Sequence, residues 1–191
     1  MSRKLVLASE SFLKHFILEK AKLKFTAIPA NIDETIYDDL DVAKRVVALA
    51  HDKAEVVAKL SPDAIIVSAD VLTSDNDGTV FTKPGTDNDP FKAAMSLSGK
   101  TITVHTGCTM YDAAIGFRDH YCATKLTYRT FTKRTLERLV GDDNYRIRSG
   151  ALGVFYDAPG FTLIERIEGS YTGALGLPME FIHEQLESLE K

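Results

Sequence analysis

The chain has 191 residues, of which 45% are hydrophobic and 26% charged, a composition typical of a folded globular protein. Its formal net charge of −4 argues against nucleic acid as a partner, because sequence-independent binding needs a basic surface. A small anionic ligand stays compatible, since a local group of lysines can oppose the overall sign. No apolar run approaches the roughly 20 residues that cross a bilayer, and no signal peptide is recognisable at the start. We therefore expect a cytoplasmic protein that binds no membrane.

The first part of the chain predicts strands alternating with helices. We expect a strand at residues 4–8, a helix beginning near Ser11, and a strand followed by a polar loop within residues 24–35. The strongest helical pattern covers residues 39–60, where apolar side chains recur at helical spacing. Lys53 lies just beside that apolar stripe, an awkward position for a side chain that is only solvated.

A continuous apolar run at residues 64–70 predicts a buried strand that ends at Asp70. Asp77 and Gly78 then suit a tight hairpin turn. The later elements expected are a helix from Pro90 to Gly99, strands at 101–110 and 120–131, a helix at 132–140, a strand at 161–169 and a helix after Pro178. This alternation indicates an α/β fold with a mixed β-sheet flanked by helices, in a single domain over residues 1–191. Cys108 and Cys122 have no metal-like spacing, and we expect both to be reduced thiols buried in strands.

Two serines at the first strand-to-helix junction form a candidate phosphate site. Backbone N–H groups and the helix dipole favour an anion at such a junction, to which Ser9 and Ser11 would add hydroxyls. Ordinary helix capping explains the same serines, and by itself is the more common arrangement. Lys14, one turn into the helix, either adds positive charge or is simply solvated.

Acids and lysines elsewhere could complete a nucleotide site. Asp70 follows a core strand, at the edge of the sheet where α/β proteins usually bind ligands, although a turn aspartate explains it equally well. Glu34, in a polar loop, together with Asp70 could hold Mg²⁺, which takes one or two carboxylates plus substrate phosphates. Lys53 and Lys83 could neutralise phosphate oxygens. The spacing has low specificity, because the chain contains none of the common nucleotide-binding or zinc-hydrolase motifs.

From about Leu5 to Met179 the chain contains, in this order, the short motifs LASES, NIDET, AHDKA, SADVL, TKP, LSGKT, SGALGV, ERIEGSY and GLP. Their order and spacing resemble the Maf family of nucleoside triphosphate pyrophosphatases. The resemblance implies an elongated fold like that of inosine triphosphate pyrophosphatases, with two lobes around a central cleft, often in a homodimer. It also implies hydrolysis of a nucleoside triphosphate to the monophosphate and pyrophosphate with a divalent cation, Mg²⁺ or Mn²⁺.

Position by position, the resemblance implies roles for individual residues. Asp70 matches the proposed general base, and Glu34 the acid that would help to hold the metal. The residues implied to bind the triphosphate are Ser9, Ser11, Lys14, Lys53 and Lys83.

The first loop departs from the usual family pattern S-x-S-P-R-R. Leu13 stands in place of the first arginine and Lys14 in place of the second. Lysine lacks the planar fork with which arginine binds phosphate. Two hypotheses therefore stay open: an enzyme with reduced or altered activity, which we prefer, and a nucleotide-binding protein with little or no turnover that acts as a regulatory or partner-binding module.

Overall fold

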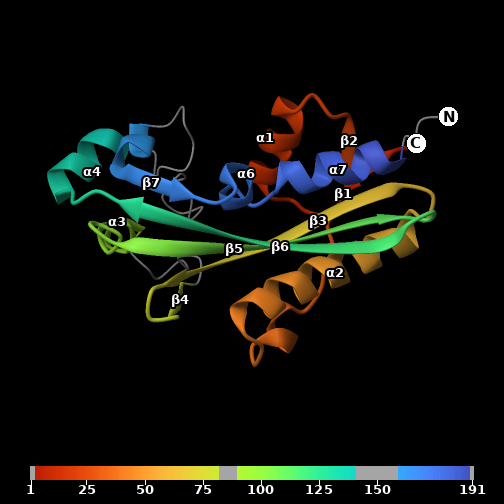
Figure 1. Ribbon diagram of the computed structural model, residues 1–191, viewed down its shortest axis with the longest axis horizontal. Coiled ribbons are helices and arrows are strands. Elements are labelled where there is room, and N and C mark those ends of the chain that lie inside the picture. Colours follow the sequence, from red (N-terminus) through yellow and green to blue (C-terminus); the bar gives the residue numbers. More distant parts are fainter. Residues whose placement is uncertain (1–2, 82–89, 141–158, 190–191) are drawn as a thin grey trace. The chain divides into compact units, whose positions relative to one another are not determined.

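The computed structural model describes residues 3–81, 90–140 and 159–189 (Figure 1). Its strands are β1 (Leu5–Leu7), β2 (Phe25–Ala27), β3 (Ile65–Asp75), β4 (Val80–Phe81), β5 (Thr101–Asp112), β6 (Gly116–Tyr128) and β7 (Ile164–Glu168). Its helices are α1 (Phe12–Lys20), α2 (Val42–Leu60), α3 (Pro90–Met95), α4 (Lys133–Val140), α6 (Tyr171–Ala174) and α7 (Met179–Leu189), with 3₁₀ helices η1 (Glu34–Tyr37) and η2 (Pro159–Leu163). The strands join in the order β2-β1-β3-β5-β6-β7, with β4 beside β3. The predicted α/β fold with a mixed sheet is confirmed.

The chain divides into two compact units. The first comprises Met1–Val71, His105–Ala123 and Thr172–Lys191, and the second comprises Leu72–Val104 and Thr124–Tyr171. Strands β3, β5 and β6 each contribute residues to both units. The single domain and the cleft between two lobes stay predictions.

Parallel strands form the centre of the first unit. β1 pairs with β2 on one side, with Leu5 opposite Phe25, and with β3 on the other, with Leu5 opposite Ile65. Helix α2 lies on one side of these strands, and α1 and α7 lie on the other (Figure 1). Helices on both faces explain why all three residues of β1 are buried and apolar.

Helix α2 matches the predicted helix closely. Asp41 caps its N-terminus by accepting a hydrogen bond from the Lys44 N–H at 3.1 Å. Its buried side chains are Val46, Leu49, Ala50, Ala54, Val57 and Ala58. Gly107 in β5 allows the helix to approach closely, because a Cβ atom there would collide with the Val46 carbonyl group. The apolar face of α2 and this side-chain-free position together fix the helix against the sheet.

Strand β3 continues past Asp70, so the prediction that the strand ends there is wrong. Its parallel pairing with β1 reaches Val67, and farther along Thr73 pairs with Phe81 in the antiparallel β4. The hairpin extends the strand because it supplies a new hydrogen-bonding partner where β1 stops. Gly78 occupies the turn with a φ of +82°, which confirms the predicted hairpin.

The second unit contains helices α3 and α4 and strand β7. Strand β7 pairs antiparallel with β6, with Leu126 opposite Ile167. Ser98 joins the end of the α3 segment to Phe131, donating to its carbonyl and accepting from its N–H, each at 2.8 Å. Pro90 opens α3 as predicted. Lys83 lies outside the described residues.

Both cysteines are free, Cys108 in β5 buried and Cys122 in β6 partly buried. This agrees with the expected unbridged thiols in strands. Within the described ranges, no helix combines the length and apolarity needed to cross a membrane.

Candidate active site

Six of the seven predicted site residues belong to the first unit: Ser9 and Ser11 follow β1, Lys14 lies in α1, Glu34 in η1, Lys53 in α2 and Asp70 within β3. Beyond β1, the Ala8 N–H still donates to the Val67 carbonyl of β3 at 2.8 Å. The chain then leaves the sheet as the Ser9 loop, residues 8–11, while β3 continues through Asp70 to Asp75. The pairing of β1 with β3 thus ends before Asp70, and a ligand site at this edge stays a prediction.

Lys53 brings the two predicted acids together. Its Nζ lies 2.6 Å from Oδ1 of Asp70 and 2.6 Å from Oε1 of Glu34. The side chains of Lys53 and Asp70 are each 12% exposed, whereas that of Glu34 is 57% exposed. Burial by itself lowers the pKa of Lys53, but the two carboxylates outweigh that effect and raise the pKa above its ordinary value. We call Glu34, Lys53 and Asp70 the Lys53 cluster.

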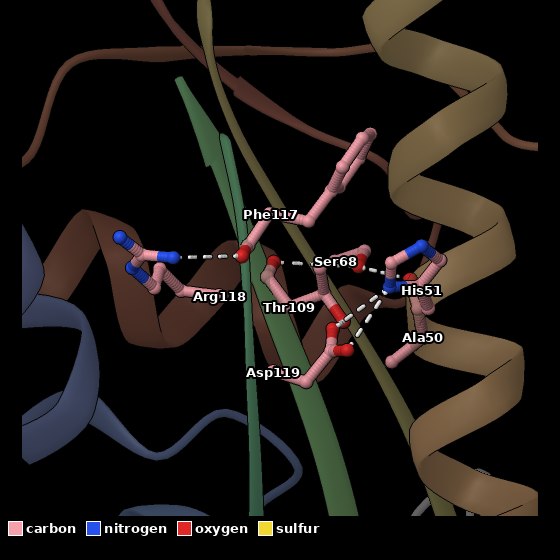
Figure 2. Close-up of polar contacts among 7 residues, drawn as sticks. All are labelled: Ala50, His51, Ser68, Thr109, Phe117, Arg118 and Asp119. Atoms are coloured by element: carbon pink, nitrogen blue, oxygen red, sulfur yellow. Dashed lines mark hydrogen bonds and ion pairs between the residues drawn. The ribbon is translucent and has the colours of Figure 1, made fainter. Parts of the chain in front are cut away.

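The placement of Lys53 depends on how α2 is held against β3. The buried Ser68 hydroxyl donates to the Ala50 carbonyl of α2, as Figure 2 shows. Ser68 and Asp70 share one face of β3, and Ala50 and Lys53 lie one turn apart on α2. The Ser68 hydrogen bond and the Lys53–Asp70 ion pair therefore link the same strand face to the same side of the helix.

A second polar contact lies along the same helix. His51 Nδ1 is 3.0 Å from both carboxylate oxygens of Asp119 in β6, and Thr109 of β5 donates to Asp119 at 2.7 Å (Figure 2). These contacts tie α2 to two further strands.

The Ser9 loop is held by its own hydrogen bonds. The Ser9 Oγ accepts from the Ser11 N–H at 3.1 Å, and the Ser9 carbonyl lies 3.0 Å from Nε2 of His15. Ser11 is the N-cap residue of α1, but its side chain makes no capping hydrogen bond. The loop thus starts the helix at the expected residue without the expected serine cap, because Ser9 supplies the local side-chain contact.

Lys14 is buried, with 9% of its surface exposed, so the solvated alternative for this residue is wrong. Helix α1 buries Lys14, Ile17 and Leu18. A Cβ atom at Gly176 would lie 3.8 Å from the Lys14 Nζ and 2.9 Å from Cγ2 of Val71. The structure therefore places Lys14 near the residue that follows Asp70, beneath the turn between α6 and α7.

Glu34 and Asp70 fit the oxygen ligands that a Mg²⁺ ion prefers. Both carboxylates converge on one cationic atom, the Lys53 Nζ, so the cluster already gathers negative charge around a single point. Across residues 3–81, 90–140 and 159–189, no group of three or more His, Cys, Asp or Glu side chains forms a metal site. Substrate phosphates would have to supply the remaining ligands.

A cavity of about 550 Å³ lies beside α2, and none of the six predicted residues lines it. Its lining residues are Tyr37, Leu40, Ala43, Lys44, Val47, Ala48, His51, Asp52, Asp119 and Tyr121. Tyr37 and Asp52 meet there through a hydrogen bond of 2.8 Å.

Reasoning from the sequence missed Ser68, Tyr37, Asp52 and Gly176. Ser68 precedes Asp70 by two residues, and Asp52 directly precedes Lys53. Closeness to a predicted site residue along the chain does not reveal a contact with another helix or strand. Gly176 stands in the GLP motif, a signal that could have marked a backbone position with positive φ; its φ is +95°.

Comparison with known proteins gives matches over nearly the whole chain. A family model described as Maf-like protein matches residues 4–189. A dTTP/UTP pyrophosphatase of Moorella thermoacetica is 36% identical over 184 residues, covering 96% of this chain and 93% of the relative. A dTTP/UTP pyrophosphatase of Clostridium perfringens strain SM101 is 32% identical over 192 residues, covering 98% and 97%. Among solved structures, a HAM1 protein from Coxiella burnetii aligns with a TM-score of 0.44 at 13% identity, covering 66% of this chain and 73% of that one.

Proposed function

Because the chain belongs to the Maf family, we propose that it hydrolyses a nucleoside triphosphate to the nucleoside monophosphate and pyrophosphate. The resemblance noted in the sequence is thereby confirmed. The observation that carries the proposal is the Lys53 cluster, which joins Glu34 and Asp70 at the ligand edge of the parallel strands.

The preferred substrates are dTTP and UTP. This choice follows the names of two relatives that each match more than nine-tenths of this chain.

Asp70 is the general base of the proposed reaction. It accepts a proton from water as the water oxygen bonds to the α-phosphorus of the triphosphate. The bond between the α-phosphorus and the α–β bridging oxygen breaks, and pyrophosphate leaves with the bond's electron pair. Lys53, whose raised pKa keeps its ammonium charged at neutral pH, holds Asp70 in place and faces the charge that develops on the phosphates.

The triphosphate binds at the Ser9 loop. Ser9 and Ser11 present the backbone at the start of α1, where the helix dipole favours an anion. Lys14 adds a buried positive charge close by, and we assign Lys83 the same role from its TKP motif.

Glu34 and Asp70 would hold a divalent cation, Mg²⁺ or Mn²⁺, together with the substrate phosphates. When bound, the ion neutralises negative charge on the phosphates. Two wider expectations also belong to this proposal: the protein is a homodimer and it works in the cytoplasm. Light scattering on the purified protein tests the first of these.

Pyrophosphate release from a panel of nucleoside triphosphates tests the activity. The panel contains dTTP and UTP, the other canonical triphosphates, and methylated and deaminated ones, each with Mg²⁺ or Mn²⁺. Asp70→Asn should lower kcat by about 10²–10⁴-fold while nucleotide binding persists, because one general base is lost. Asp63→Asn is the matched control, since it makes the same charge change at an exposed position just before β3.

Two results would contradict the proposal. Turnover by Asp70→Asn equal to that of the wild type would show that Asp70 is not the general base. A folded wild-type protein that binds triphosphates yet releases no pyrophosphate would instead support the nucleotide-binding alternative, which the replacement of the loop arginines motivates.

A further inference from the structure

The short helix η1 presents Glu34 to Lys53. Glu34 is the first residue of η1, and its side chain is 57% exposed. Packing around the carboxylate therefore contributes little to its position. Besides the ion pair with Lys53, the position of the carboxylate depends on the backbone of η1 and on the contacts that join η1 to α2.

The last residue of η1 supplies such a tie. The Tyr37 hydroxyl donates to Oδ2 of Asp52 at 2.8 Å, and Asp52 directly precedes Lys53 in α2. Side chains three residues apart on a 3₁₀ helix lie on the same face. Glu34 and Tyr37 thus point together toward α2, where they meet Lys53 and Asp52.

Three other interactions hold the two ends of η1. At its start, Asp33 accepts hydrogen bonds from the Thr35 N–H at 2.9 Å and from the Thr35 hydroxyl at 2.7 Å. Just past its end, Asp38 forms an ion pair with Arg45 of α2. Because the turn is braced at both ends, a shift of Tyr37 would be transmitted to Glu34.

We propose that Tyr37 and Asp52 are positioning residues that hold the Glu34 carboxylate at the Lys53 cluster, where it would help to bind the divalent cation and the triphosphate. This inference rests on the proposed function, in which Glu34 is a metal ligand. Removing a residue that orients a metal ligand without touching the metal typically lowers metal affinity or activity by about 10–100-fold.

Tyr37→Phe tests the proposal by deleting only the hydroxyl. The Mg²⁺ concentration that gives half-maximal pyrophosphate release should rise about 10–100-fold, while kcat at saturating Mg²⁺ stays near the wild-type value. Asp52→Asn keeps an acceptor oxygen and should have a smaller effect. The double variant should behave like Tyr37→Phe alone, because Asp52→Asn can weaken only the hydrogen bond that Tyr37→Phe has already removed.

Tyr121→Phe is the matched control. Tyr121 lines the same cavity, and its hydroxyl lies 2.7 Å from Nδ1 of His105 instead of a residue beside Lys53. The Mg²⁺ concentration that Tyr121→Phe needs for half-maximal activity should equal that of the wild type. An unchanged metal requirement in Tyr37→Phe, or equal increases in Tyr37→Phe and Tyr121→Phe, would overturn the proposal.

A binding measurement separates this inference from the proposed activity. Mn²⁺ is titrated by electron paramagnetic resonance into each protein in the presence of a non-hydrolysable triphosphate. Weaker Mn²⁺ binding by Tyr37→Phe than by Tyr121→Phe supports the positioning role even if no triphosphate is hydrolysed. Equal Mn²⁺ binding by the two variants, or none by the wild type, contradicts it.

Discussion

The Nζ of Lys53 lies 2.6 Å from Oδ1 of Asp70, so that helix α2 and strand β3 meet in an ion pair at the candidate site. A hydrogen bond from Ser68 to the Ala50 carbonyl joins the same two elements one helical turn away. The residue proposed for catalysis is therefore held by contacts that also hold the fold together.

Replacing Lys53 should affect both activity and stability. Lys53→Met leaves two carboxylates facing each other without a cation, and we expect kcat/KM to fall by about 10²–10³-fold. The free energy of unfolding should fall by about 1–3 kcal/mol, because a partly buried charge loses its partner. Steady-state kinetics and denaturant titration measure the two effects.

Lys59→Met provides the comparison for that variant. Lys59 is on the same helix and forms an exposed pair with Glu55 at 3.3 Å, which should be worth no more than about 1 kcal/mol. If Lys59→Met were as inactive as Lys53→Met, the loss would reflect helix stability and not the cluster.

The Lys53 cluster should give the protein a stability limit at alkaline pH. The pKa of Lys53 is raised from its ordinary 10.5, so the folded state holds this proton more tightly than the unfolded state. The stability that the charged Lys53 contributes is complete below pH 10.5 and is lost as the pH rises through the raised pKa of Lys53. Denaturant titrations at increasing pH should measure the difference in the free energy of unfolding between wild type and Lys53→Met. This difference should stay constant around neutral pH and shrink only under strongly alkaline conditions. A difference that disappears near neutral pH would contradict the shift.

Gly176 should tolerate no side chain. Its φ of +95° costs an alanine about 1–2 kcal/mol, and the added Cβ would lie 2.9 Å from Cγ2 of Val71. Because Val71 follows Asp70, Gly176→Ala should lower both the melting temperature and kcat/KM. Gly116→Ala has the same backbone cost, with a φ of +69° and no atom within 4 Å of its Cβ, and should lower only the melting temperature. Equal effects of the two variants on kcat/KM would show that the Val71 contact is irrelevant to the site.

Restoring an arginine to the first loop should raise activity. Leu13→Arg returns the planar fork that binds phosphate, and a single added donor to the transition state is worth up to about 10²–10³-fold in rate. The measurement is kcat/KM for each accepted triphosphate. Phe12→Arg adds the same charge at an exposed neighbouring position and should leave kcat/KM nearly unchanged. No gain from Leu13→Arg on any substrate would mean that the site has rearranged around Lys14.

Patterns within single elements predicted the fold well. Helix α2 follows from apolar residues at helical spacing, and the hairpin turn follows from Asp77 and Gly78, because both signals depend on residues close together in the chain. The prediction that β3 ends at Asp70 is wrong because the end of a strand does not depend only on residues close together in the chain. Strand length depends on whether a partner is available, and β4 supplies that partner from farther along the chain.

The sequence by itself determined the family, the order of strands and helices, and which acids and lysines to consider. It could not determine that Lys53 binds both Glu34 and Asp70, that Lys14 is buried, or that Tyr37 reaches Asp52. Each of these facts depends on how α2, η1, β3 and the turn before α7 pack together. Packing of that kind is set by close approach at positions such as Gly107 and by single hydrogen bonds such as that of Ser68. Helical or strand periodicity records which face of an element is buried, but not which residue of another element it meets.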